Sequence, residues 1–294
     1  MICIIEIPPP PANDECSQAI TIAPTAFMQT RGIPVNTSGA TLSGGLPESC
    51  NSGLDDLWYK FKATNTKHII RYSDLRAEIG KNGAVGFVVY YANNDNNFNC
   101  LNPGEPIFCG ENSGVFKEGG ATISGLVNGK FYYIRIWTHG QSSGNFHSFN
   151  FFLENPPPKP LNDECSTAFE IQPQEFSKDC MNGIHVTNAG ATQSTGITNI
   201  CTEPPQKMDA WYKFIATTNQ YLFNVANFQT LVGYENYAVV EIYNAGTNPM
   251  NACQSSLTPV TCLQINRKMV VKNFIPGNTY FLRISTLSTF TFND

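Results

Sequence analysis

The chain has 294 residues, of which 41% are hydrophobic and 14% are charged, and this length is enough for two domains of ordinary size. Its net charge is −5 and it contains no block of basic residues, which excludes the charge pattern of most nucleic-acid-binding proteins. No apolar run reaches the roughly 18 residues that a membrane-spanning helix requires, so we expect no membrane insertion. The 10 cysteines favour an oxidising compartment, which is the extracellular space, the cell surface or the periplasm.

In chain order, the first element is a short apolar segment at residues 1–7, which is followed by a proline-rich stretch at 8–12. The same order recurs where Phe149–Asn155 precedes a second proline-rich stretch at 155–161, so that Glu6 and Glu154 fall in the same column. The recurrence predicts that residues 1–7 are a spare terminal β-strand. Both proline stretches are expected to be semi-rigid extended linkers.

Two repeats follow the proline stretches, at residues 13–154 and 162–294. The second repeat carries the motifs of the first in the same order and at nearly constant offsets, which indicates one fold used twice. The matched motifs are Asn13–Cys16 with Asn162–Cys165, Gly39–Thr41 with Gly190–Thr192, Trp58–Phe61 with Trp211–Phe214, and Gly129, Tyr132 and Arg135 with Gly277, Tyr280 and Arg283.

Within each repeat the residue pattern is typical of β-structure. Runs such as Gly86–Tyr91 and Phe131–Trp137 are rich in β-branched and aromatic residues, and Gly, Asn, Pro and Ser bound them. No segment has convincing helical periodicity. We therefore predict an all-β protein: two tandem antiparallel, jelly-roll-like β-sandwich domains joined by a proline-rich linker, with an N-terminal donor-type strand.

Eight cysteines occur at matching places, namely Cys16, Cys50, Cys100 and Cys109 in the first repeat and Cys165, Cys201, Cys253 and Cys262 in the second. The last two of each repeat are nine residues apart, which favours a disulfide that closes a short loop. Cys16–Cys50 and Cys165–Cys201 would then be the other disulfides. Four cysteines permit three pairings, so the alternatives stay open. No CxxC motif or histidine cluster supports zinc.

Cys3 and Cys180 have no counterparts. By the offset between the repeats, the second repeat ends at Asp294 before the strand that closes the first, while the chain begins with a spare one. A sandwich without an edge strand exposes unpaired backbone groups, and a strand from another copy can add there. The expected donor residues are Ile2, Ile4, Ile5 and Ile7.

Such a contact is head-to-tail, so it builds a surface fibre or a ring from copies of the same chain. An intermolecular Cys3–Cys180 disulfide would use both remaining thiols. Two alternatives remain open: the sequence is a window cut from a longer tandem array, or residues 2–7 fold back onto the second repeat of their own chain. All three make this segment a strand that completes a sheet.

These motifs resemble the repeat modules of Bacteroidota surface proteins that are cargo of the type IX secretion system, and also pre-peptidase C-terminal and CUB-like β-sandwiches. The likeness covers nearly the whole chain, twice. It implies an extracellular, non-catalytic role as an accessory or adhesive protein, and it specifies no ligand. In such modules the terminal strand often carries a cysteine, as Cys3 does here, whereas Phe151 occupies that place in the first repeat, which also lacks a counterpart of Cys180.

The strongest acidic set comprises Asp14, Glu15 and Asp56, with Asp163, Glu164 and Asp209 in the second repeat. Calcium prefers several carboxylate and carbonyl oxygens in loops, so calcium is the cofactor that this set favours. The alternative is that these residues cap turns and strand ends through backbone N–H groups. Arg135 and Arg283 are expected to be structural, either facing solvent or pairing with an acid.

No catalytic constellation supports an enzyme. Gly140–Gly144 matches the pattern of a nucleophile elbow around Ser142, but it lies between two β runs instead of a strand and a helix, so we interpret it as a hairpin turn. Trp58 and Trp211 are expected in the core. The candidates for carbohydrate contact are Tyr90, Tyr91, Tyr234, Tyr237 and Tyr243.

The leading prediction is a structural or adhesive surface protein. The alternative is a glycan- or calcium-binding accessory module of a larger secreted protein.

Overall fold

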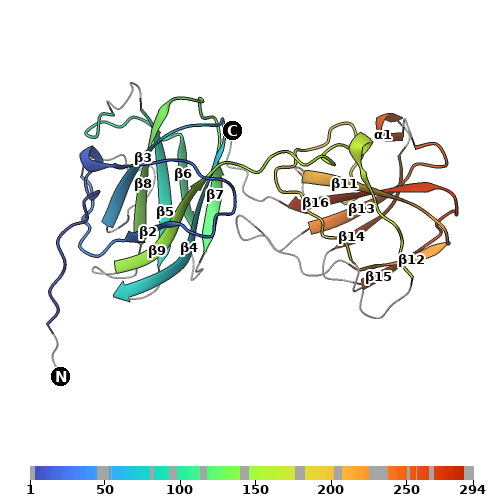
Figure 1. The fold of residues 1–294 in the computed structure, drawn as a ribbon, viewed down its shortest axis with the longest axis horizontal. Helices are drawn as coiled ribbons and strands as arrows, with labels where there is room; N and C mark the ends of the chain where they lie inside the picture. The colour runs from blue at the N-terminus through green and yellow to red at the C-terminus, as the bar shows by residue number, and fades with distance from the viewer. Residues whose placement is uncertain are drawn as a thin grey trace. The chain divides into compact units, whose positions relative to one another are not determined.

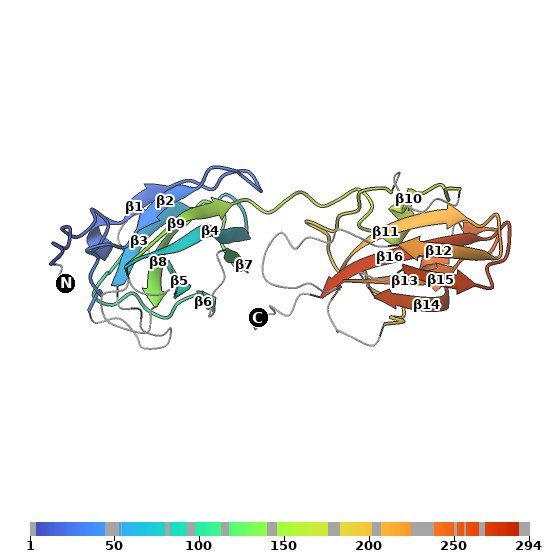
Figure 2. The same cartoon turned by 90° about the horizontal axis from the view of Figure 1, so that it is seen from below.

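A computed structural model of the chain describes residues 4–44, 53, 55–79, 83–92, 98–112, 118–139, 146–175, 183–201, 207–224, 238–249, 252–255, 257–264 and 268–287. The chain divides into two compact units, Met1–Pro156 and Pro157–Asp294. Figures 1 and 2 show that the regular elements of each unit are almost all strands. Among the described residues, no helix is long and apolar enough to cross a membrane.

The first unit is a sandwich of two sheets. The five-stranded sheet has the order β1-β3-β8-β5-β6, with bounds Ile20–Ile22, Asp55–Lys62, Phe131–His139, Ala84–Tyr91 and Phe108–Asn112. The four-stranded sheet has the order β2-β9-β4-β7, with bounds Ile33–Asn36, Phe146–Glu154, His68–Ile79 and Gly119–Ile123. Strand β1 is parallel to β3, and the other pairings of these strands are antiparallel.

The main core of the first unit lies between these sheets, because side chains alternate between the two faces of each strand. Phe87 of β5 lies 5.9 Å from Phe151 of β9 and 6.1 Å from Tyr72 of β4, measured between ring centroids. The opposite face of the five-stranded sheet carries a second buried cluster, which includes Trp58, Tyr90, Tyr133 and Trp137. The central strands are therefore buried on both faces, which explains their almost continuous apolar runs.

The second unit repeats the five-stranded sheet. Its order is β10-β11-β16-β13-β14, with bounds Phe169–Glu170, Lys207–Ile215, Thr279–Leu287, Ala238–Asn244 and Thr258–Gln264. A further sheet consists, in the described residues, of the antiparallel strands β12 (Gln220–Asn224) and β15 (Lys268–Lys272). The short helices are η1 (Cys16–Gln18), η2 (Cys165–Thr167) and α1 (Ala252–Ser255).

Backbone hydrogen bonds identify β12 and β15 as the counterparts of β4 and β7. The Leu126 N–H donates to Thr66 O after β7, and the Phe274 N–H donates to Asn219 O after β15. In the first unit, β9 follows β8 and pairs with the other edge of β4. Its counterpart would follow β16, and residues 288–294 lie outside the described part of the chain.

Three disulfides join cysteines that are far apart in the sequence: Cys16–Cys100, Cys165–Cys253 and Cys201–Cys262. Cys109 is also disulfide-bonded, and Cys3, Cys50 and Cys180 lie outside the described residues.

The expected pairing of neighbouring cysteines is therefore wrong, because Cys100 bonds to Cys16 and Cys253 bonds to Cys165. Cys100 belongs with Cys16 to the cluster that covers the outer face of the five-stranded sheet, whereas Cys109 lies in its edge strand β6. The nine-residue spacing thus connects two different parts of the sandwich.

Each proline stretch lies against the repeat that follows it. A Cβ atom on Gly39, which has φ +81°, would lie 2.3 Å from Pro8 O and 2.8 Å from Pro9 O. Gly190, with φ +75°, meets Pro158 O and Pro157 O in the same way, at 2.4 and 2.8 Å. Only glycine fits both the backbone conformation and the close approach. The expected linkers at 8–12 and 155–161 are thus anchored at these glycines.

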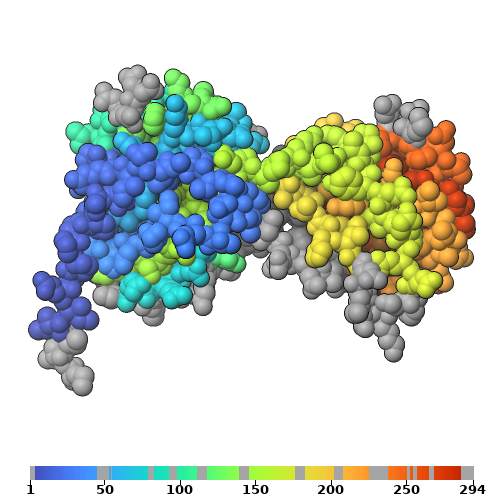
Figure 3. Space-filling view, in the orientation of Figure 1, coloured from blue at the N-terminus to red at the C-terminus, as the bar shows by residue number. Residues whose placement is uncertain are grey.

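The predicted fold, two tandem antiparallel β-sandwiches, is confirmed. Residues 4–7, the described part of the expected donor strand, form no strand with their own chain. Ile4, Ile5 and Ile7 are 94%, 68% and 61% exposed. Figure 3 shows this dark blue segment standing away from the first unit.

Candidate functional site

The Asn-Asp-Glu-Cys motif ties the start of each repeat to the tryptophan strand. The Asn13 side-chain amide donates to Trp58 O at 3.1 Å, and the Trp58 N–H donates to Asn13 O at 2.8 Å. Asn162 and Trp211 make the same two bonds, at 3.0 and 2.8 Å. Because both asparagines are buried, the first motif residue is structural in each repeat.

The aspartate of the motif holds the Gly-Ala-Thr turn. The Asp14 carboxylate accepts from the Thr41 N–H at 2.6 Å and from the Thr41 hydroxyl at 2.7 Å. Asp163 accepts from both groups of Thr192 in the same way. Burial alone would raise the pKa of Asp163, but the hydrogen bonds from Lys159 and Thr192 outweigh it and lower that pKa below its ordinary value.

A buried ion pair lies on the outer face of the first unit's five-stranded sheet. The Asp56 carboxylate, on β3, accepts from Arg135 Nε of β8 at 2.7 Å. It also accepts from the Ser43 N–H and hydroxyl at 3.1 and 2.7 Å, and from the Trp58 indole at 3.2 Å. The indole donates to the Ser43 hydroxyl as well, at 2.9 Å. All lone-pair directions of this carboxylate are therefore engaged.

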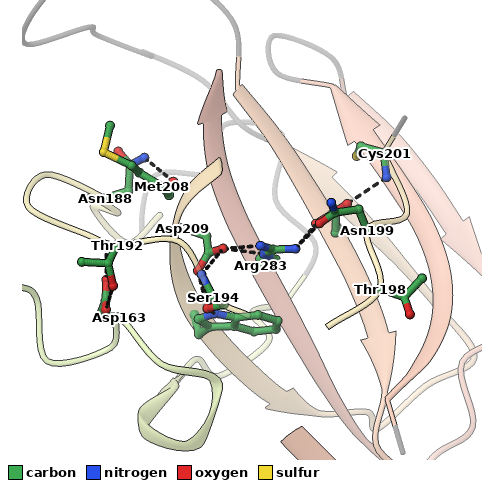
Figure 4. Close-up of polar contacts among 12 residues, drawn as sticks. Asp163, Asn188, Thr192, Ser194, Thr198, Asn199, Cys201, Met208, Asp209 and Arg283 are labelled. Carbon is green, nitrogen blue, oxygen red and sulfur yellow. Dashed lines mark hydrogen bonds and ion pairs between the residues drawn. The ribbon is translucent and has the colours of Figure 1, made fainter. Parts of the chain in front are cut away.

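The second unit repeats this arrangement around Asp209 and Arg283 (Figure 4). Asp209 accepts from Arg283 Nε at 2.7 Å, from the Ser194 hydroxyl at 2.6 Å and from the Trp211 indole at 3.1 Å. A second guanidinium nitrogen of Arg283 contacts the same carboxylate. Of the two alternatives predicted for each arginine, the structure shows pairing with a buried acid in both repeats.

The second unit adds a third charged residue, Glu241 of β13. Glu241 lies opposite Arg283 in the sheet, and its carboxylate lies 3.3 Å from Arg283 Nη1. The same carboxylate accepts from the N–H groups of Ile200 and Cys201, at 2.7 and 2.8 Å. In the first unit the residue opposite Arg135 is Val88, so the two repeats differ by one buried charge.

Two further side chains hold residues 198–201 against the five-stranded sheet of the second unit. The Arg283 guanidinium also donates to Asn199 Oδ1, and the Tyr243 hydroxyl donates to Thr198 O at 2.8 Å. Burial and the Glu241 carboxylate raise the pKa of Tyr243, which keeps its hydroxyl protonated. Burial would lower the pKa of Arg283, but Asp209 and Glu241 raise it overall, so the guanidinium stays charged.

A separate polar network closes one end of the first unit. Asp55 Oδ1 accepts from the Thr138 hydroxyl at 2.6 Å, and His147 Nδ1 lies 3.1 Å from that hydroxyl. The His147 N–H donates to the Thr37 hydroxyl at 3.0 Å. Asp55, Thr138, His147 and Thr37 are buried, and burial raises the pKa of Asp55 above its ordinary value.

The predicted calcium ligands are not brought together. Asp14 binds Thr41, Asp56 binds Ser43, Trp58 and Arg135, and Glu15 is exposed. Glu164 is an exposed partner of Lys159, at 3.0 Å. In the described ranges, no group of three or more His, Cys, Asp or Glu side chains could hold a metal ion. The recurring carboxylates serve instead as hydrogen-bond acceptors that hold turns and a buried arginine.

The structure describes three of the five tyrosines that are candidates for carbohydrate contact. Tyr90 and Tyr243 are buried, so neither can stack on a sugar. Tyr91 is partly buried, and its ring lies 5.5 Å from that of Tyr132. Tyr234 and Tyr237 lie outside the described residues. Trp58 and Trp211 are fully buried, as predicted. The Ser142 turn also lies outside the described residues. The motif residues that recur in both repeats therefore form a framework.

Sequence reasoning missed Ser43, Ser194 and Glu241. The two serines had a signal, because each follows the Gly-Ala-Thr motif by two residues, at Thr41-x-Ser43 and Thr192-x-Ser194. Glu241 had none, because it occurs in one repeat and lies near Arg283 only through the strand register.

Comparison with known proteins identifies the domain type. A family model described as galactose binding domain-like, of a class associated with type IX secretion, matches residues 12–151 and again 161–294. No curated protein matches the chain.

Two solved structures resemble it with low scores. A crystal structure of tripeptidyl peptidase 2 has 10% identity and a TM-score of 0.25, over 90% of this chain and 22% of the peptidase chain. The tandem CBM22-1-CBM22-2 domains of Paenibacillus barcinonensis Xyn10C have 10% identity and a TM-score of 0.24, over 92% of this chain and 95% of theirs. The chain thus spans about a fifth of the peptidase's length. The family match covers nearly all of both repeats, and the chain belongs to the galactose-binding-domain-like family associated with type IX secretion.

Proposed function

We propose that this chain is a non-catalytic extracellular module with a structural or adhesive role, and that its second unit accepts an apolar strand from another copy along the edge of β12. The family match and the disulfides support an exported protein. The observation that carries the assembly is the difference between the two units at this edge.

The first unit shows what the edge requires. Strand β4 pairs with β7 on one side and with β9 on the other. From β9, the buried side chains of Phe149, Phe151 and Leu153 enter the core between the sheets. An added strand thus supplies both the backbone hydrogen bonds of one edge and several large core side chains.

The same edge in the second unit is more exposed. Leu222 of β12 is 45% exposed, whereas its counterpart Ile69 in β4 is 4% exposed. Phe223 is partly buried, whereas its counterpart Ile70 is fully buried. In the described residues, β12 pairs with β15 alone. An apolar strand placed along β12 would bury these side chains, as β9 does in the first unit.

The proposed donor is the segment that contains Ile4, Ile5 and Ile7. Its isoleucines are among the most exposed apolar side chains of the described chain, and Glu6 occupies the place of Glu154 at the end of β9. Cys3 of the donor and Cys180 of the acceptor remain the expected intermolecular disulfide.

The experiment is light scattering during size-exclusion chromatography, together with non-reducing gel electrophoresis, over a range of concentrations. The wild-type chain is expected to form oligomers with a disulfide-linked ladder, and Ile5→Asp is expected to be monomeric. Leu101→Asp, which changes an exposed leucine elsewhere, is the matched control and should assemble like wild type.

A rival occupant of the β12 edge is the chain's own sequence after Leu287. In that case the wild-type chain would be monomeric at all concentrations, and Ile5→Asp would change nothing. Phe290→Asp and Phe292→Asp would instead lower the unfolding temperature of the second unit. This combination would contradict the proposed assembly.

Carbohydrate binding is a second candidate function, favoured by the family match to a galactose-binding-like domain in both repeats. Titration calorimetry with galactose and a glycan array would test it, with each repeat's binding assigned by competition. Binding of a glycan by the monomeric Ile5→Asp variant would establish this function independently of assembly.

A further inference from the structure

The outer face of β12 and β15 carries a small apolar patch with basic side chains beside it. Leu222 and Val270 lie directly opposite each other and are 45% and 55% exposed. Lys268 and Lys272 stand two residues to either side of Val270 on β15, and both are exposed. Neither lysine forms an ion pair with another described residue.

In the first unit, one acidic residue of β9 is held by a cation at the corresponding place on β4. Glu154 of β9 lies opposite Ile69 and is fully buried. Its carboxylate accepts from Arg71 Nη2 at 2.9 Å, and Arg71 stands two residues after Ile69 on β4. The Arg71 guanidinium also lies 3.7 Å from the centre of the Phe152 ring. One acidic residue thus fixes the position of the strand by pairing with a cation on the outer face.

The cation has moved to the neighbouring strand in the second unit. By the strand equivalence, Asn224 occupies the place of Arg71, and Lys268 occupies the place of Gly120, which lies opposite Arg71. In the first unit the basic side chain is on β4, and glycine lies opposite it on β7. In the second unit asparagine is on β12, and the basic side chain lies opposite it on β15. The positive charge stays on the same face, one strand further from the edge.

We infer that the strand accepted by β12 is recognised through its charge, and that Glu6 of the donor pairs with Lys268 of the acceptor. This inference rests on the proposed strand addition and goes further by naming the residues that fix its register. With Glu6 at the place of Glu154, its side chain lies opposite Leu222 on the outer face, together with Ile4 at the place of Phe152. Ile5 then points inward, at the place of Leu153.

The distances are compatible with this pairing. Neighbouring strands lie about 4.8 Å apart and Lys268 is offset by two residues along the strand, so Glu6 and Lys268 are roughly 12 Å apart at the backbone, a gap that extended lysine and glutamate side chains span. Lys272 lies on the other side of Val270, opposite Gln220. Both lysines are offset by two residues from Glu6 in this register. The direction selects Lys268, because Arg71, which pairs with Glu154, lies opposite Gly120, the counterpart of Lys268. A register shifted along β12 would bring the carboxylate nearer to Lys272.

The test uses a synthetic peptide of residues 1–12 with Cys3→Ser as the probe. The acceptor is the full-length chain carrying Ile5→Asp, which cannot donate its own strand. Fluorescence anisotropy measures binding. The Glu6→Gln peptide is expected to bind about threefold more weakly, as for a solvent-accessible ion pair, and the Glu6→Lys peptide about tenfold more weakly.

Charge reversal in the acceptor completes the test. Lys268→Glu should restore the Glu6→Lys peptide to within about twofold of the original pair, whereas Lys272→Glu should not restore it. Equal binding of all three peptides, or restoration by Lys272→Glu, would overturn the inference while leaving strand addition intact. Failure of the unaltered peptide to bind would instead overturn the proposed function itself.

Discussion

Arg283 and Asp209 form an ion pair whose side chains are 1% and 0% exposed, so the pair is shielded from solvent in the second unit. Arg135 and Asp56 form the same pair in the first unit, with 5% and 0% exposure. Removing one member of a buried pair leaves the other charge unpaired in a medium of low dielectric constant, which typically costs about 3–5 kcal/mol. Both pairs are therefore expected to be essential for stability.

Replacing the arginines should show a difference between the units. Arg135→Met leaves one buried carboxylate, whereas Arg283→Met leaves two, Asp209 and Glu241. We expect losses of unfolding free energy near 3 kcal/mol for the first variant and near 5 kcal/mol for the second. Calorimetry of the full chain measures both, with Lys62→Met and Lys272→Met as exposed controls. A smaller loss for Arg283→Met than for Arg135→Met would contradict this account.

Glu241→Val places in the second unit the residue that the first unit has at the same position. The variant removes the acceptor of the Ile200 and Cys201 N–H groups. We expect these amides to exchange with deuterium faster, and the second unit to lose about 1–3 kcal/mol. The reciprocal Val88→Glu should destabilise the first unit, because it buries a second carboxylate beside Arg135, which already pairs with Asp56. Unchanged exchange at Ile200 would show that Glu241 does not hold this segment.

The pH dependence of the first unit should reflect Asp55. Because burial raises the pKa of its carboxyl above the ordinary 3.8, the folded state favours the protonated form. The stabilising contribution of this group is complete below the unfolded pKa and is lost as the pH rises through the raised folded value.

Asp55→Asn removes this titration. Relative to wild type, the variant should be less stable in acid and should lose less stability between acid and neutral pH. Thermal unfolding at a series of pH values measures the difference. A wild-type-minus-variant difference that does not change with pH would contradict the assigned shift.

Removing calcium should have little effect on the described framework. Asp14 and Asp56 are already engaged by protein donors, so we expect unfolding temperatures in EDTA and in millimolar calcium to agree within about 1 °C. Asp56→Ala should destabilise the first unit equally in both conditions, because its partner is Arg135. A calcium-dependent gain in stability that Asp56→Ala abolishes would restore the calcium site.

The long-range disulfides should dominate the covalent stabilisation. Cys201 and Cys262 enclose a separation of 61 residues, for which loop entropy gives about 4 kcal/mol. The double variant Cys201→Ser with Cys262→Ser should lose about that much. Peptide mapping under non-reducing conditions should recover Cys16 with Cys100 and Cys165 with Cys253. Recovery of Cys253 with Cys262 would overturn the connectivity.

The fold was predictable because the same motifs occur in the same order in both repeats. The recurrence of Asn13, Gly39, Trp58 and Arg135 marked the residues that hold each sandwich, although not their roles. The sequence favours Asp56 as a metal ligand, because it shows that a carboxylate recurs but not which donors surround it. That information depends on strand register, which places Arg135 beside Asp56 across the sheet.

The predicted disulfide pairing is wrong for a related reason. Closeness along the chain suggested Cys100 with Cys109, but the segment between them passes from the outer face of the sheet to its edge strand. Glu241 could not be found, because nothing in its local sequence differs from an ordinary strand residue. Its partners are set by three-dimensional neighbours from β16 and from residues 198–201.

The contact between each proline stretch and a glycine turn has a mechanical consequence. Asn155 still donates its N–H to Thr25 of the first unit at 2.7 Å, while the carbonyl of Pro157 already rests against Gly190 of the second. Each proline stretch thus belongs structurally to the repeat that follows it. A pulling force on either repeat would therefore have to break that repeat's own proline–glycine contact before it could extend the adjoining spacer.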